Sequence, residues 1–311
     1  MTRTKSPLVT PRLFVFCFCL AALAGCASTP DDKAVKKPTA PEVSGKQKKE
    51  QEARFIKDIY RALEEGNVAT ADALRVRVLY INPKSVEARL ARGEIFLRQA
   101  RYGRAMETFK SLVKEEKLLA RSYQGIGVAR LQQGRRAAAK QAFDKAVSLD
   151  GGLWRAWNGL GYFYDSVKDW KRAQQSYNRA LKLRRDKPAL FNNRGFSKLM
   201  QSRYEDAIVD FRAALKLNPL LKVTRMNIRL AQAWLGRYVE AIAGASKQDL
   251  PSVLNNIGYI AMIKGEYAAA DAYFSRAMQL SPSFNETASN NLQKLEAFKS
   301  QSRPKGTKEK R

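Results

Sequence analysis

The sequence predicts an all-α fold, a solenoid of about seven helix-turn-helix units closed by a C-terminal capping helix. One observation is a fixed period of small residues, a second is the helical spacing of apolar residues on either side of polar turns, and a third is an aromatic residue four positions after most of the small ones. The small residues stand 34 apart at Ala71, Ala105, Ala139, Ala173, Ala207 and Ala241, and the next, Ala270, comes after 29. An ordinary helical bundle would not keep this phase, so the period predicts stacked repeats.

The clearest unit runs from residue 154 to residue 187. The residues that repeat are Trp157, Leu160, Gly161 and Tyr164 in its first helix, and Trp170, Ala173, Tyr177 and Ala180 in its second. Small residues on facing helices let the backbones approach, and aromatic rings fill the sides of the seam. This pattern resembles the tetratricopeptide repeat. The resemblance implies a right-handed solenoid whose first helices line a concave face that binds other polypeptides.

The repeat array is expected to cover residues 52–284, with units starting near residues 52, 86, 120, 154, 188, 222 and 251. The first unit is degenerate, and the sixth lacks five residues after Ala245 compared with the 34-residue period. We therefore expect a shortened second helix in the sixth unit and a local change of superhelical pitch before the seventh. Residues 285–300 are predicted to form the capping helix, and residues 301–311 a basic, disordered tail.

The N-terminal residues 1–25 have the composition of a secretory signal peptide, because basic residues precede a short apolar run that ends in small residues. The run ends in Leu-Ala-Gly before Cys26, which resembles the box of bacterial lipoproteins. That resemblance implies that Cys26 is the lipidation site, and Ala27 after it implies sorting to the outer membrane, facing the periplasm. A signal peptide without lipid and an uncleaved anchor are the alternatives.

Residues 26–51 are rich in Pro, Lys and Ser and are predicted to be the lipidated cysteine and a flexible tether. A flexible chain of this length reaches on the order of 30 Å. The other two cysteines, Cys17 and Cys19, fall within the predicted signal peptide. The fold of the mature chain is therefore expected to depend on helix packing, without disulfides.

The composition argues against the common kinds of catalytic and metal-binding site. The chain has no His, and no free Cys is expected after processing, so the commonest bases, nucleophiles and metal ligands are missing. Gly125 and Gly127 lie inside a predicted helix, where packing explains them, and are not a phosphate loop. We expect neither an enzyme nor a cofactor, metal or small-molecule substrate. The net charge of +28 points to anionic lipid or an acidic protein, or to solvated helix faces, since an exported protein meets little nucleic acid.

The expected binding groove lies on the first helices of the middle and late units. Its candidate residues are Asn158, Tyr162, Asn192, Asn193, Phe196, Asn227, Trp234, Asn255, Asn256 and Tyr259. An Asn side chain donates and accepts, so a regular series of them can hold the backbone of an extended peptide. This is similar to the asparagine ladders of peptide-binding tetratricopeptide proteins. The alternative is that the amides cap helices, bond to neighbouring helices or face water, and that the aromatic rings pack in the seams.

Signal, box and repeats together resemble two groups of bacterial lipoproteins, the TadD-type proteins of tight-adherence (Flp) pilus loci and the pilotins of type IV pilus systems. The resemblance implies a non-enzymatic scaffold that is held to the membrane by its N-terminal lipid. Its expected partner is a secretin or another pilus or secretion subunit. A general envelope adaptor for cell-wall enzymes or barrel-protein assembly is one alternative, and a basic protein that binds anionic surfaces is another.

Overall fold

A computed structural model describes residues 44–281 and 286–302. The first helices of the seven units are α1 (Gly45–Glu64), α3 (Val86–Arg98), α5 (Leu119–Gln132), α7 (Trp154–Ser166), α9 (Pro188–Met200), α11 (Lys222–Trp234) and α13 (Leu250–Ile263). The second helices are α2 (Val68–Ile81), α4 (Tyr102–Ser111), α6 (Arg136–Leu149), α8 (Trp170–Leu183), α10 (Tyr204–Leu217), α12 (Tyr238–Ile242) and α14 (Tyr267–Gln279). The 3₁₀ turn η1 (Glu116–Leu118) precedes α5, and α15 (Glu286–Ser302) follows the last unit.

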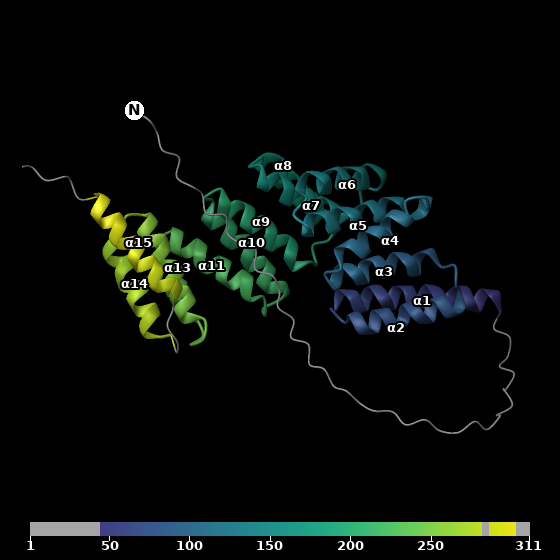
Figure 1. Ribbon diagram of the computed structural model, residues 1–311, viewed down its shortest axis with the longest axis horizontal. Coiled ribbons are helices and arrows are strands. Elements are labelled where there is room, and N and C mark those ends of the chain that lie inside the picture. The colour runs from purple at the N-terminus through teal and green to yellow at the C-terminus, as the bar shows by residue number, and fades with distance from the viewer. Residues whose placement is uncertain (1–43, 282–285, 303–311) are drawn as a thin grey trace, which may run out of the picture. The chain divides into compact units, whose positions relative to one another are not determined.

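The helices stack in chain order (Figure 1). In each unit the two helices pack on each other, and the second helix also packs on the first helix of the next unit. Each first helix from α1 to α13 contacts the next first helix, ending with α15. The first helices therefore form one continuous layer. The predicted all-α solenoid with its capping helix is confirmed over the described residues.

Aromatic rings of the second helices pack between glycines of two successive units. A Cβ added to Gly93 or to Gly125 would lie 2.5 Å from the ring of Phe109. Phe143 has the same arrangement between Gly127 and Gly159. Carbon atoms pack at about 3.5–4.0 Å, so only glycine lets the helices approach this closely. The packing explanation for Gly125 and Gly127 is confirmed.

The tether was expected to extend to residue 51, and this boundary is wrong. Helix α1 already begins at Gly45, so residues 45–51 form its first turns. Ser44 accepts a hydrogen bond from the backbone N–H of Gln47, whose side chain accepts one from the N–H of Ser44. This capping box starts the helix. The predicted signal peptide, residues 26–43 with the predicted lipidation site Cys26, and most of the predicted basic tail lie outside the described residues.

The second helix of the sixth unit is short, as the missing residues predict. It spans five residues, whereas the other second helices span 10 to 14. Arg229 of α11 stands where most first helices have glycine, and its guanidinium donates to the carbonyls of Ala241 and Ala243 at 2.8 Å. Those carbonyls would otherwise lack partners at the early helix end. The change of pitch beyond this unit stays a prediction.

The capping helix closes the described array. Leu295 of α15 is fully buried beside Phe274 and Ala261, and Leu292 packs at the edge of the same cluster. Within the described ranges, no helix combines the length and the apolar character that crossing a membrane requires.

Candidate binding face on the first helices

All ten predicted groove residues lie on first helices, from α7 to α13. Their exposure differs. Asn227 and Asn255 are buried, most of the others are half-buried, and Tyr259 is 37% exposed. The ten residues therefore differ in how accessible they are to a ligand, and they differ also in their hydrogen bonds.

The asparagines of α7, α9 and α11 bond to one another. Asn193 donates from Nδ2 to Oδ1 of Asn158 at 3.0 Å. Asn227 donates in the same way to Asn192 at 3.1 Å, and the hydroxyl of Thr224 donates to the same oxygen at 2.9 Å. These bonds join neighbouring first helices, which is one of the alternatives to a peptide ladder. They use part of each amide's capacity and fix the register of the three helices.

A similar bond closes the series at the C-terminal end. Asn291 of α15 donates to Asn255 of α13 at 3.0 Å, and both side chains are buried. Asn291 was not among the predicted residues, although it follows Asn255 at close to the repeat distance. Asn256 is different, because its Nδ2 lies 3.6 Å from the sulfur of Met226 and its side chain is half-buried.

The aromatic residues also divide. The indole of Trp234 stacks on the ring of Tyr204, with centroids 5.9 Å apart and planes 3° from parallel. Trp234 therefore packs against the neighbouring unit. Tyr162 and Phe196 are half-buried, and only Tyr259 has an exposed ring among the predicted aromatics.

The first helices of the last three units have no charged side chain at five shared register positions. Five register positions of α9 recur in α11 and α13, and they hold Ala189, Asn192, Asn193, Phe196 and Met200, then Val223, Met226, Asn227, Leu230 and Trp234, then Ser252, Asn255, Asn256, Tyr259 and Ile263. Large apolar side chains are exposed among them, with Met200 at 46%, Val223 at 57% and Ile263 at 48%. We call Met200, Val223, Tyr259 and Ile263 the apolar stripe.

The same face of the first units carries charges, and four of the charged side chains pair with each other. Arg121 of α5 contacts Glu87 of α3 at 2.9 Å. Arg155 of α7 contacts Glu94 of α3 at 3.0 Å. Sequence reasoning missed these pairs, although Glu87 and Arg121 stand one 34-residue period apart. Their side chains are occupied by one another, which leaves the late units as the open part of the face.

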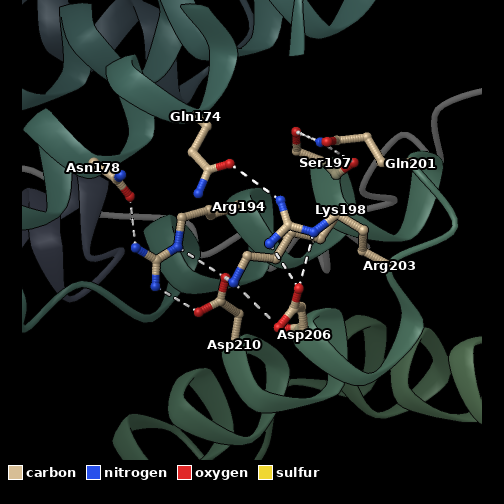
Figure 2. A network of polar contacts seen from close by, with 9 residues as sticks. All are labelled: Gln174, Asn178, Arg194, Ser197, Lys198, Gln201, Arg203, Asp206 and Asp210. Atoms are coloured by element: carbon tan, nitrogen blue, oxygen red, sulfur yellow. Dashed lines mark hydrogen bonds and ion pairs between the residues drawn. The ribbon is translucent and has the colours of Figure 1, made fainter. Parts of the chain in front are cut away.

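The junction between the fourth and fifth units holds α9 in place (Figure 2). Asp210 of α10 is 2% exposed and lies 2.6 Å from Arg194 and 2.7 Å from Lys198, both on α9. Arg194 also donates to Asn178 of α8 at 2.8 Å. These contacts join α8, α9 and α10, so the first-helix face of α9 is presented on a fixed support.

A second buried carboxylate lies at the same junction. Asp165 of α7 accepts hydrogen bonds from the hydroxyls of Tyr177 at 2.8 Å and Ser197 at 2.6 Å. Burial raises the pKa of Asp165, and the two hydroxyls only partly oppose that effect. Neither pair of contacts forms a catalytic arrangement with an exposed reactive group, and within the described residues no cluster of three His, Cys, Asp or Glu side chains could hold a metal ion.

Comparison with known proteins agrees with this architecture. Models described as tetratricopeptide repeat match residues 60–117, 120–152, 155–187 and 251–284, together about half of the chain. The unmatched fifth and sixth units include the shortened helix. No curated protein sequence matches the chain.

Solved structures share the fold at low identity. A human IFIT1 dimer with m7Gppp-AAAA is 13% identical, with a TM-score of 0.56 over 80% of this chain and 64% of that one. A thermophilic tetratricopeptide protein of Thermus thermophilus is 20% identical, covering 61% and 98% of the two chains with a TM-score of 0.49. A Pseudomonas aeruginosa pilF structure is 17% identical, covering 79% and 99% with a TM-score of 0.47. The similarity to the human IFIT1 structure supports the fold alone. The repeat models match about half of this chain, and the chain therefore belongs to the tetratricopeptide repeat family.

Proposed function

We propose that this chain is a membrane-anchored scaffold that binds a largely apolar segment of a partner protein on the first-helix face of its last three units. The single observation that carries the proposal is the apolar stripe on α9, α11 and α13. Its four members are all more than a third exposed and none of their register positions is charged. Repeat arrays bind other polypeptides on extended faces of this kind, and exposed apolar side chains at uncharged positions supply the contact surface.

The hydrogen bonds between asparagine side chains of neighbouring first helices support this function by stiffening the surface, whereas a peptide ladder would use the same side chains to hold the peptide. They hold neighbouring first helices in one register before any partner arrives. A preorganised surface loses less conformational entropy on binding, so more of the contact energy appears as affinity. Asn256 is half-buried, and within the described ranges its Nδ2 has no oxygen partner, so it is the amide best able to bond to the partner's backbone.

The finer proposal places the scaffold at the outer membrane, with the lipid on Cys26 and a secretin or pilus subunit as partner. Its support is the sequence around Cys26 and the family's capacity to bind protein segments. A tether between lipid and array raises the local concentration of a partner at the membrane. Replacing Cys26 with Ser is expected to release the protein from the membrane fraction. Continued firm membrane association of that variant contradicts the anchor.

Capture from envelope extracts tests the binding face. The double substitution Tyr259→Ser with Ile263→Ser removes half of the stripe from one helix, whereas Val209→Ser with Val239→Ser removes exposed apolar side chains from second helices. Val209 and Val239 are 63% and 83% exposed, so the control changes surface of the same kind. We expect only the first pair to abolish capture of the partner, identified by mass spectrometry. Equal capture of the partner by the two double variants contradicts the proposed binding face. Capture of a cell-wall enzyme in place of a secretin contradicts only the proposed role in pilus or secretin assembly.

A further inference from the structure

We propose a second binding surface on the other side of the array, a groove beside α8 that takes an acidic peptide segment carrying one large apolar side chain. The surface lies between the second helix of the third unit and both helices of the fourth unit, and it shares no residue with the apolar stripe. Two independent observations lead to it, a local excess of unpaired positive charge and an open groove with an apolar floor.

Positive charge is concentrated at the second helix of the fourth unit. Residues 167–187 contain eight basic and two acidic residues. The equivalent stretch of the next unit, residues 201–221, contains three of each. The second helix of the fourth unit therefore lies in a stretch with a net charge of +6, whereas the equivalent stretch of the next unit is neutral.

Two of these basic groups have no partner among the described residues. Arg172 pairs with Asp169 at 2.6 Å, and Arg184 with Asp186 at 2.7 Å. In contrast, Arg179 and Lys182 are exposed and make no hydrogen bond or ion pair in the described part of the chain. Unpaired cations are available to bind a carboxylate, and an Arg–carboxylate pair is among the stronger polar contacts.

A groove of about 570 Å³ runs along this helix. Val147 of α6 and Trp157, Leu160 and Tyr164 of α7 contribute apolar surface to it, and Arg172 and Arg179 of α8 line it. Asp144 of α6 also lines it, and its carboxylate is paired with Lys140 at 2.6 Å. The Trp157 indole is fixed, because its N–H donates to the carbonyl of Gly151 at 3.0 Å. Arg172 lies over the Tyr164 ring at 4.6 Å. The groove is therefore apolar at its floor and cationic along one wall.

The length of the basic row on α8 favours an extended peptide as the ligand. Arg172, Arg179 and Lys182 lie on one stripe of α8, and ten residues of helix extend about 15 Å. An extended peptide covers that length with about five residues. A lipid bilayer presents a flat surface and would leave the groove unfilled. Charge complementarity and the apolar floor together favour acidic residues on either side of an aromatic or aliphatic one.

The test uses the full chain and a defined probe, a fluorescein-labelled peptide of four glutamates, one phenylalanine and four glutamates, measured by fluorescence anisotropy. The variant is Arg179→Glu with Lys182→Glu. Its matched control is Arg212→Glu with Lys216→Glu on α10, where both side chains are likewise exposed and unpaired within the described residues. Circular dichroism verifies that both variants keep the helical content of the wild type.

We expect the α8 variant to weaken peptide binding at least tenfold and the α10 control to change it less than twofold. A second peptide with serine in place of phenylalanine is expected to bind at least fivefold more weakly than the first. Equal weakening by both variants, equal binding of the two peptides, or no binding to the wild type overturns the proposal. Phosphatidylglycerol vesicles are a further probe. If the vesicles bind through Arg179 and Lys182 and the peptide does not bind, the surface recognises lipid and the proposal is overturned.

Discussion

The ammonium group of Lys187, just before α9, lies 3.0 Å from the carboxylate of Glu64, the last residue of α1. The guanidinium of Arg184 lies 3.6 Å from the same carboxylate. The contact joins the first unit to the junction of the fourth and fifth units. Partial burial acts to raise the pKa of Glu64, but Lys187, Arg184 and Arg155 outweigh it and hold that pKa below its ordinary value.

Glu64→Gln is therefore expected to loosen α1 without unfolding the array. The Glu64 side chain is 43% exposed, so solvent screening limits the loss to about 0.5 kcal/mol, or roughly a twofold faster amide hydrogen exchange in α1. Since the pKa of Glu64 is lowered in the folded chain, the stabilisation is present above the ordinary pKa of a glutamate and is lost as the pH falls below it. The difference between variant and wild type should shrink as the pH falls through the lowered pKa of Glu64, and it should vanish in 1 M salt. Glu65→Gln, next to it and exposed, serves as control, and equal exchange in both variants contradicts the contact.

Two carboxylates of α10, one turn apart, allow a buried and an exposed ion pair to be compared at the junction of the fourth and fifth units (Figure 2). Asp210 is 3% exposed at its side chain and pairs with two cations, whereas Asp206 is 52% exposed and pairs with Arg203 at 2.7 Å. Asp210→Ala leaves two cations in a partly buried site without their anion, which costs about 3–5 kcal/mol. Asp206→Ala costs at most about 1 kcal/mol.

Hydrogen exchange of α9 and α10 measures both variants, because neighbouring units in a repeat array unfold with some independence. Exchange in α1 and α2 should stay unchanged for either variant. A similar loss for Asp206→Ala and Asp210→Ala would mean that burial does not separate the two ion pairs.

The repeat period predicted the fold because the small residues of the seams have to recur wherever two helices pack closely. Gly93, Gly127 and Gly161 follow that rule, and each faces a ring of its own second helix. The same reasoning predicted the short α12 from a count of missing residues. The start of α1 was harder to place, because its first turns are exposed and carry no apolar periodicity, so only the Ser44 cap indicates them.

The candidate site was only partly predictable. Register places Asn192 beside Asn227, but sequence does not say whether two adjacent amides bond to each other or to a ligand. The contact between Glu64 and Lys187 depends on the rotation accumulated over several units, which no local pattern encodes. Arg229 was recognised as a departure from the glycine series, yet its role follows only from the carbonyl groups that it reaches.

Asp165 provides a prediction about pH. Its pKa is raised by burial, so the folded chain holds the proton more tightly than the unfolded chain does. That contribution to stability is complete below the ordinary pKa of aspartate, about 3.9, and is lost as the pH rises through the raised value. Asp165→Asn removes this dependence, so its stability relative to the wild type should increase between pH 4 and pH 7 in thermal unfolding. A constant difference over that range contradicts the raised pKa.

Asp165→Ala separates the charge from the hydrogen bonds. It removes the acceptor of both Tyr177 and Ser197, whose hydroxyls are buried, and unsatisfied buried donors cost about 1–3 kcal/mol in total stability. Asn keeps an acceptor, and each hydroxyl can rotate to donate or accept. At pH 7 the alanine variant should therefore be clearly less stable than the asparagine variant. Equal stability of the two would show that the hydroxyls find other partners.

The last prediction concerns the close approach at Gly159. A Cβ there would lie 2.3 Å from the ring of Phe143, and the opposite side of that ring faces Gly127, where a Cβ would lie 2.4 Å away. The ring therefore has no room to shift, and Gly159→Ala should destabilise the junction of the third and fourth units by about 1–3 kcal/mol. Gly103→Ala is the control, because it lies on the exposed side of α4 with no atom within 4 Å and should gain about 0.5–1 kcal/mol from helix propensity. Phe143→Leu combined with Gly159→Ala should be less destabilised than the sum of the single changes, since the smaller side chain leaves space for the added methyl group. Additive losses in the double variant would place the strain elsewhere than between these two side chains.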